Sequence, residues 1–270
     1  MSNVRLMGVL NITPDSFSDG GQFLSVDAAL RHAEALVSDG ADILDIGAES
    51  SRPGAVPLSI QEEIDRLTPF LSQYSAHFDI PLSLDTYHSE TASLGIGYGV
   101  RWINDITGLS YDKQMISTIK KGEHVGVIIM HMQGTPHTMQ DAPKYEDVVQ
   151  EVRISLQEKI AMCRSNGLTD IIIDPGIGFG KSVTHNLNLL RQLKALTQGD
   201  CPVLVGTSRK SFIGHITGAS VQDRLGGSIA SSLYAVNQGA GIIRCHDIKE
   251  MNQALQVWHS IEGSPSPVCR

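Results

Sequence analysis

The glycine-rich stretch from Asp174 to Ser182, DPGIGFGKS, has the residue types of a phosphate-binding loop. A Walker-type loop needs a glycine, four further residues and then Gly-Lys-Ser or Gly-Lys-Thr, but Pro175 stands where the first glycine belongs. The dinucleotide fingerprint also fails, because it requires two residues before its third glycine and Gly178 is followed by only one before Gly180. We therefore expect these glycines to serve a purpose other than that of either phosphate loop.

Two basic side chains end the apolar run GIIRCHD near the end of the chain. Arg244 and His246 are separated by Cys245, and alternate residues of a strand point to the same side. This spacing lets the two side chains share one anion. An exposed arginine is usually only a solvated charge, but Arg244 ends an otherwise apolar strand, so a binding role is favoured.

The composition limits the class of protein. The chain has 270 residues, 41% hydrophobic and 19% charged, with a formal net charge of -8 from 21 basic and 29 acidic residues, which is typical of a globular enzyme. It has no basic tract with interleaved aromatic residues, so we predict no nucleic-acid partner. No apolar run approaches the roughly 20 residues that span a bilayer, and the N-terminus lacks a cleavable signal. A cytoplasmic location is expected by default.

The four cysteines are spaced without a C-x-x-C pair. Cys163, Cys201, Cys245 and Cys269 are scattered through the chain. This arrangement suits reduced structural thiols better than a disulfide framework or a zinc site. We therefore place no cysteine in the functional site.

One structural unit recurs along the chain, namely a helix that ends at glycine, a short β-branched run, and an acidic or amide residue at the end of the run. Glycine accepts the left-handed turn after a helix, and continuous Ile, Val and Leu mark strands buried on both faces, as in parallel sheets. Between these runs lie amphipathic helices, one of which we expect to begin at Ser25 as its N-cap. The predicted strands are Leu6–Leu10, Ile43–Ile46, Leu82–Asp85, Trp102–Asp105, Val125–Met130, Ile171–Asp174, Val203–Gly206 and Ile242–Cys245.

Eight alternating strand and helix units in a chain of this length predict an α/β fold, the TIM (β/α)8 barrel, as a single domain over residues 1–270. A doubly wound open sheet is the alternative. In a TIM barrel the chemistry lies at the carboxyl ends of the strands. The polar residues at those ends are Asn11, Ser50 to Arg52, Asp85, Asn104, His131, Asp174, Lys210, Arg244 and His246.

The motifs at these strand ends, in this order, resemble those of the dihydropteroate synthase family from Met7 to about Asp247. The motifs are MGVLNITPDSFSDGG, DIGAESSRPGA, LDTYHS, INDITG, MHMQGTP, IIIDPGIGFGKSVTHNL, GTSRKSFIG and GIIRCHD. The resemblance implies a pterin-binding transferase of folate biosynthesis. It would join 6-hydroxymethyl-7,8-dihydropterin diphosphate to 4-aminobenzoate with magnesium, release diphosphate, act as a homodimer and be a sulfonamide target.

The resemblance also implies a pterin site. A carboxylate such as Asp174 can accept both donors of the guanidine-like pterin edge, and an amide such as Asn104 can donate and accept at once. A fixed carboxylate at Asp85 would stabilise positive charge on the pterin methylene if the C–O bond breaks first. The implied pterin contacts are Asp85, Asn104, Met130, Asp174, Phe179, Lys210 and Arg244, with Asp85, Lys210 and Arg244 as catalytic residues; His131 is left out of the site.

For the other two ligands the resemblance implies separate sets of residues. Diphosphate would meet Asn11, Arg52, Arg244 and His246, and Mg²⁺ would take a single protein oxygen, from Asn11, because it keeps most of its waters. The 4-aminobenzoate would meet Phe17, Ser51, Pro53 and the helix start at Ser211. Two departures from the family pattern stand out: Ser51 replaces an expected threonine, which puts ring contacts and the sulfonamide response in doubt, and the segment before Met7 is short.

Two other functions remain open from the sequence. A methyltetrahydrofolate-binding methyltransferase shares the barrel and the pterin carboxylates, but SFSDGG, SSRPG and SRKSF disfavour it because they serve diphosphate and aminobenzoate. A pterin-binding paralogue without catalysis, acting as a regulatory or scaffold subunit, is disfavoured because Asn11, Arg52, Lys210 and Arg244 are all present. The turn-rich loop Asn11 to Phe23 is further expected to become ordered, together with Ser50 to Pro57, when pterin diphosphate and Mg²⁺ bind.

Overall fold

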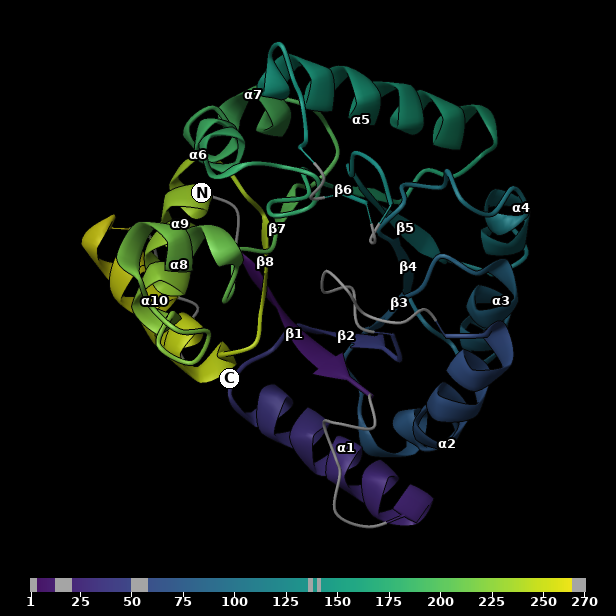
Figure 1. Cartoon of the computed structure of the whole chain (residues 1–270). Coiled ribbons are helices and arrows are strands. Elements are labelled where there is room, and N and C mark those ends of the chain that lie inside the picture. The colour runs from purple at the N-terminus through teal and green to yellow at the C-terminus, as the bar shows by residue number, and fades with distance from the viewer. Residues whose placement is uncertain (1–3, 13–20, 50–57, 136–137, 140–141, 264–270) are drawn as a thin grey trace.

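Eight parallel strands form one sheet that curls into a barrel (Figure 1). The computed structural model describes residues 4–12, 21–49, 58–135, 138–139 and 142–263. The strand order is β6-β5-β4-β3-β2-β1-β8-β7, which confirms the TIM barrel and excludes the open doubly wound sheet. The strands are β1 (Arg5–Asn11), β2 (Ile43–Gly47), β3 (Leu82–Asp85), β4 (Trp102–Asp105), β5 (Gly126–Met130), β6 (Ile171–Asp174), β7 (Leu204–Val205) and β8 (Ile242–Cys245).

The barrel closes between the two strands at the ends of this order, β6 and β7. Ile173 forms an isolated parallel bridge with Val203, and the Ile173 N–H donates to the carbonyl oxygen of Pro202 at 3.0 Å. Closure matters for function because it brings the carboxyl ends of β5 to β8 around the same mouth as those of β1 to β4.

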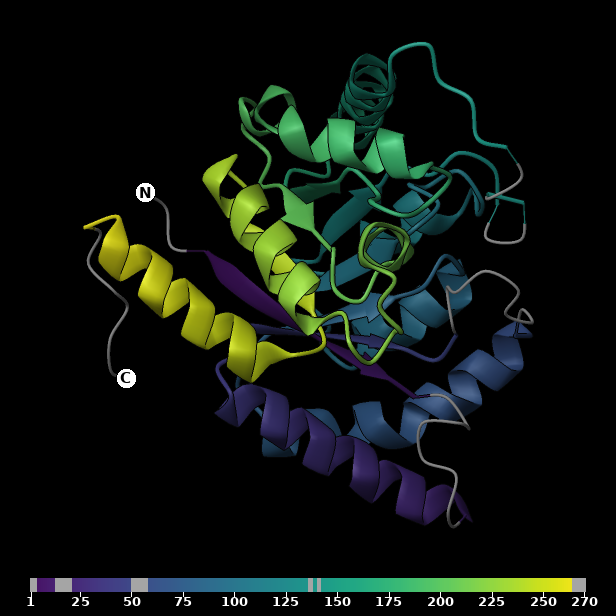
Figure 2. The same ribbon diagram turned by 60° about the vertical axis from the view of Figure 1, so that its left-hand side comes forward.

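Helices surround the barrel on the outside (Figure 1). Figure 2 shows α1 and α10 on the same side of β1, outside the barrel. No helix among the described ranges is long and apolar enough to cross a membrane. The helices are α1 (Gly21–Ser38), α2 (Ile60–His77), α3 (Ser89–Gly97), α4 (Met115–Ile119), α5 (Val148–Ser165), α6 (Val183–Arg191), α7 (Lys194–Thr197), α8 (Ser211–Thr217), α9 (Leu225–Asn237) and α10 (Ile248–Ile261).

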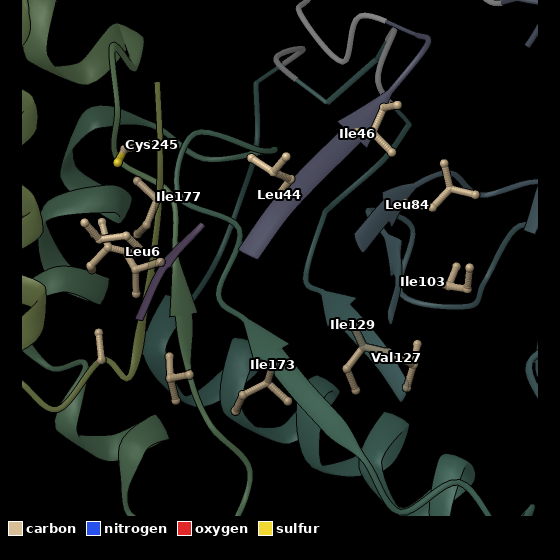
Figure 3. Close-up of a cluster of buried hydrophobic side chains, with 14 of the residues drawn as sticks. Leu6, Leu44, Ile46, Leu84, Ile103, Val127, Ile129, Ile173, Ile177 and Cys245 are labelled. Atoms are coloured by element: carbon tan, nitrogen blue, oxygen red, sulfur yellow. The ribbon is translucent and has the colours of Figure 1, made fainter. Parts of the chain in front are cut away.

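Strand residues alternate between two apolar layers. One layer packs the strands against the helices and includes Leu44, Ile46, Leu84 and Ile103 (Figure 3). The other fills the barrel interior with Met7, Ile43, Trp102, Ile128, Ile172, Leu204 and Ile242. Successive strand residues face opposite sides, so the residue two positions after an inward-facing apolar residue also points into the barrel, nearer its carboxyl end. The interior apolar layer therefore forms the floor of the mouth at that end.

The predicted boundaries differ from the structure in a few places. All eight strands agree to within one residue at each end, and the prediction for β7, Val203–Gly206, is one residue too long at both ends because the strand covers only Leu204–Val205. The expectation that Ser25 caps the first helix is wrong, because α1 begins at Gly21 and already includes Ser25. A serine next to an apolar pattern fits an N-cap and an early helical position equally well, so the sequence alone did not separate them.

Candidate active site

Parallel pairing brings the predicted polar residues to one end of the barrel. Asp85 is the last residue of β3 and pairs in register with Asn104 of β4. Asp174 is the last residue of β6 and pairs with Met130, the last residue of β5. Since paired residues of neighbouring strands point to the same side, their side chains face the same mouth.

A network of ion pairs joins three strands on one side of this mouth. The Arg244 Nε donates to Asp45 Oδ2 at 2.6 Å, and one Nη donates to Asp85 Oδ2 at 3.2 Å. The same Asp45 oxygen accepts from the Asn104 amide at 3.1 Å. Arg244 therefore links β2 and β3 to β8, and its side chain is only 22% exposed.

Asp45 belongs to the site but is not among the residues predicted from the sequence. It lies in β2 with 0% of its surface exposed. The sequence does carry a signal, because Asp45 ends the stretch GADILD, which has the recurring pattern of a glycine, an apolar run and an acidic residue. A carboxylate inside an apolar strand needs a buried partner, and that partner is Arg244.

Arg244 and His246 have different partners in this structure. His246 Nδ1 lies 2.9 Å from the Ser208 hydroxyl oxygen, whereas Arg244 is paired with carboxylates. Burial, followed by the positive charges of Arg244 and Arg209, lowers the pKa of His246 to about 4. The sharing of one anion by Arg244 and His246 stays a prediction.

Asp174 is held by the glycine turn that follows it. The Gly176 N–H donates to Asp174 Oδ1 at 2.7 Å, and the residue is 8% exposed. Gly176, Gly178 and Gly180 have φ values of +67°, +86° and +59°, a left-handed conformation that glycine adopts without strain. Burial raises the pKa of Asp174, while the Gly176 N–H and the charge of Lys210 oppose that shift.

The same turn packs closely against the loop after β5, which explains the glycines of DPGIGFGKS. A Cβ on Gly176 would lie 2.0 Å from the His131 carbonyl oxygen, and one on Gly180 would lie 2.5 Å from the Gln133 carbonyl oxygen. What the structure gives them is close contact with a neighbouring loop.

Lys181 and Ser182 complete the same turn. The Lys181 ammonium donates to the carbonyl oxygens of Phe179 at 2.8 Å and His131 at 3.1 Å. Ser182 caps α6, with its hydroxyl accepting from the His185 N–H at 3.2 Å. Burial lowers the pKa of Lys181 to about 7 and that of His131 to about 3. Lys181 and Ser182, which resemble the end of a phosphate-binding loop, are therefore already bonded to groups of the protein itself.

Lys210 lies opposite this turn, at the start of α8. Its Nζ sits 4.0 Å from the centre of the Phe179 ring, a cation–π contact. Burial, then the charge of Arg244, lowers the pKa of Lys210 to about 8. Phe179 and Met130 belong to one buried apolar cluster with Ile106 and Met139. Three of the predicted pterin contacts, Met130, Phe179 and Lys210, therefore lie together at one wall of the mouth. Ser211 is the first residue of α8, as predicted.

The surroundings of the Asp85 carboxyl at the mouth shift its pKa. Burial raises its pKa, the charge of Asp45 adds to the rise, and Arg244 opposes it. In their ionised forms, the two carboxylates of Asp45 and Asp85 outnumber the single guanidinium of Arg244 in this network. A positive charge that develops nearby would be stabilised.

Asn11, the predicted magnesium ligand, is the half-buried last residue of β1. Within the described ranges its amide forms no hydrogen bond to another side chain. Among the same residues, no group of three or more His, Cys, Asp or Glu could hold a metal by itself. A magnesium ion that relies on one amide oxygen and substrate phosphates fits this donor set. Phe17, Ser51, Arg52 and Pro53 lie outside the described residues.

Comparison with known proteins identifies the relatives of this chain. The model of the pterin-binding enzyme family matches residues 7–246. The Escherichia coli K12 dihydropteroate synthase is 42% identical over 95% of this chain and 91% of its own length. A Xanthomonas albilineans dihydropteroate synthase with 4-aminobenzoic acid superposes with a TM-score of 0.90 at 40% identity, covering 97% of this chain and 94% of the other. The Xanthomonas albilineans enzyme in complex with 7,8-dihydropteroate has a TM-score of 0.87 at 38% identity, covering 97% and 95%.

Proposed function

This chain belongs to the dihydropteroate synthase family of pterin-binding transferases, and we propose that its barrel mouth catalyses the family reaction with the residues described above. The reaction joins 6-hydroxymethyl-7,8-dihydropterin diphosphate to 4-aminobenzoate and releases diphosphate. One observation supports this most directly: a buried carboxylate, Asp174, faces a mouth that also holds Lys210 and the paired Arg244.

The pterin is proposed to bind at Asp174, with Asn104, Met130, Phe179 and Lys210 around it. The guanidine-like edge donates two hydrogen bonds, and the carboxylate has acceptor capacity beyond the bond from Gly176. The ammonium of Lys210 would donate to the pterin carbonyl. Met130 and Phe179 supply an apolar wall for the ring.

Asp85 and Arg244 are proposed to act on the reacting bond. As the bond to diphosphate breaks, positive charge develops on the pterin methylene, and the carboxylate of Asp85 would stabilise that charge. The other side of the reaction is negative, so the leaving diphosphate would meet Arg244, His246, Arg52 and Asn11. A magnesium ion held through Asn11 and phosphate oxygens would neutralise charge on the leaving group.

The 4-aminobenzoate is proposed to bind by Phe17, Ser51, Pro53 and the N–H groups at Ser211. We propose ordered binding, with pterin diphosphate and Mg²⁺ first. Ordering a loop costs about 1 to 2 kcal/mol per residue, which contacts to a highly charged diphosphate can offset and one small aromatic acid cannot. Titration of 4-aminobenzoate into the free chain and into the chain saturated with diphosphate and Mg²⁺ tests this; equal affinity would reject the order.

The chain is further proposed to be a single barrel domain, cytoplasmic and homodimeric. Exposed apolar side chains on the neighbouring helices α9 and α10 support a dimer, among them Val257 at 56% and Ile261 at 76% exposure. A second copy would cover this surface. Sedimentation should show a dimer for the native chain and a monomer for Val257→Glu; a native monomer would reject the dimer.

The deciding experiment measures diphosphate release from the pterin diphosphate, with and without 4-aminobenzoate. The proposed function predicts release that depends on 4-aminobenzoate and forms 7,8-dihydropteroate in equal amount. Pterin binding without release would favour the non-catalytic paralogue. Methyl transfer from methyltetrahydrofolate, with no diphosphate release, would favour the methyltransferase.

A further inference from the structure

Ser208 and His246 connect the loops after β7 and β8 at the mouth of the barrel. The Ser208 hydroxyl oxygen lies 2.9 Å from His246 Nδ1 and also accepts the backbone N–H of His246 at 3.3 Å. Ser208 is 7% exposed. The hydroxyl is therefore committed to a single residue, through both its backbone and its ring.

A second link fixes the two loops against each other. Arg209 donates through Nε to Asp247 at 3.1 Å and through a second nitrogen to the other carboxylate oxygen. The Arg209 backbone N–H donates to Ser228 at 2.9 Å. Ser208 and His246 thus lie next to the Arg209–Asp247 ion pair, so their relative position does not depend on their own contact alone.

The imidazole of His246 is uncharged at neutral pH. Burial and the neighbouring cations Arg244, Arg209 and Lys210 lower its pKa to about 4, and the carboxylate of Asp247 only partly opposes this. An uncharged imidazole has one N–H and one acceptor nitrogen. The chemistry that His246 offers to a ligand depends on which nitrogen carries the hydrogen.

The hydroxyl of Ser208 decides between the two forms. If Nδ1 carried the hydrogen, Ser208 would accept two hydrogen bonds and its own hydroxyl hydrogen would have no acceptor among the described residues. If Nε2 carries the hydrogen, the hydroxyl donates to Nδ1, so that both the buried hydroxyl and Nδ1 are paired. An unpaired buried donor disfavours the first form by about tenfold or more.

We propose that Ser208 is a positioning residue that holds His246 as the form with its hydrogen on Nε2, which presents an uncharged N–H donor to the departing diphosphate. This role rests on the proposed function, because that function brings diphosphate to His246. Within the described chain no group bonds Nε2, so the donor is available to a ligand. An uncharged donor orients an anion while holding it less tightly than a cation would, which favours product release.

The first test is the ¹⁵N spectrum of the histidine-labelled chain, with the His246 ring assigned by its loss in His246→Gln. Without ligand, the native chain and Ser208→Thr, which keeps the hydroxyl, should carry the hydrogen on Nε2. Ser208→Ala should give a mixture of the two forms. Hydrogen on Nδ1 in the native chain, or no change in Ser208→Ala, overturns the proposal.

The second test is a double-mutant cycle read by calorimetry with inorganic diphosphate and Mg²⁺. A glutamine at position 246 places an amide N–H near the position of Nε2 and has no tautomer to set. Ser208→Ala should weaken diphosphate binding about tenfold in the native background and less than twofold in the His246→Gln background. Equal losses in both backgrounds would mean a merely structural role and overturn the proposal. Because binding is measured without turnover, a chain that binds as expected but forms no 7,8-dihydropteroate contradicts the proposed function instead.

Discussion

The two sides of the barrel mouth differ in how their carboxylates are paired. On the Arg244 side, which comprises Asp45, Asp85, Asn104 and Arg244, one guanidinium is shared by two protein carboxylates. On the Asp174 side, which comprises Asp174, Phe179, Lys181 and Lys210, the carboxylate is bonded to the Gly176 N–H and forms no ion pair among the described residues. One side is paired internally, and the other keeps a carboxylate for a ligand.

This contrast predicts which substitutions affect the stability of the fold and which affect ligand binding. A buried cation between two carboxylates is costly to remove, because the remaining charges lose their partner. A carboxylate held only by a backbone N–H can accept further donors without breaking an ion pair. We therefore expect substitutions on the Arg244 side to affect folding strongly, and substitution of Asp174 to affect mainly ligand binding.

The largest expected effect is that of Arg244→Met. It leaves Asp45 and Asp85 buried together without a cation, so the free energy of unfolding should fall by about 3 to 5 kcal/mol. Urea denaturation measures the loss. The matched control is Arg209→Met, which removes a pair whose arginine side chain is 40% exposed and should cost about 1 kcal/mol or less. Similar losses in the two variants would contradict the contrast between the sides.

The next effect tests the backbone support of Asp174. Gly176→Ala places a Cβ 2.0 Å from the His131 carbonyl oxygen at a φ of +67°, so we expect a loss of about 3 kcal/mol in stability. Gly218→Ala is the control, since its φ is +75° and nothing lies within 4 Å of the added Cβ. That variant should lose only the conformational cost of about 1 kcal/mol. Equal losses would show that the close packing of the turn is unimportant.

The smallest effect per residue is the loss of the stability that two histidines contribute, in mild acid. The pKa values of His131 and His246 are lowered by burial to about 3 and about 4, so the unfolded chain takes up protons below pH 6.5 while the folded chain does not. The stability that each of these two histidines contributes is complete above pH 6.5 and falls as the pH drops toward its folded-state pKa, by about 2 kcal/mol for each histidine at pH 5. His131→Gln and His246→Gln should each flatten the pH dependence of urea denaturation. An unchanged slope in either variant would exclude that histidine.

Much of the fold followed from the sequence for a simple physical reason. Strands buried on both faces read as continuous apolar runs, and the glycines that end the preceding helices mark their starts. Trp102–Asp105 and Ile171–Asp174 were therefore placed correctly to the residue. The prediction for the two-residue strand β7 is too long at its start because Val203 is equally apolar but pairs only through an isolated bridge.

The partners inside the site were harder to predict. Asp45 and Arg244 are 199 residues apart in the chain, and no local pattern links them. Ser208 and His246 likewise meet only because the barrel places the ends of β7 and β8 together. The sequence identified residue types at the strand ends, whereas the choice among possible partners depends on geometry that only the closed barrel defines.

The most direct measurement is the calorimetric affinity of Asp174→Asn for the pterin diphosphate. The variant keeps an oxygen that can accept from the Gly176 N–H, so the turn and the melting temperature should be preserved. It presents an amide donor to the donor edge of the pterin, and we predict weaker binding by about 2 to 4 kcal/mol. A loss of less than tenfold in affinity, with the fold intact, would contradict the assignment of Asp174 as the carboxylate that binds the pterin.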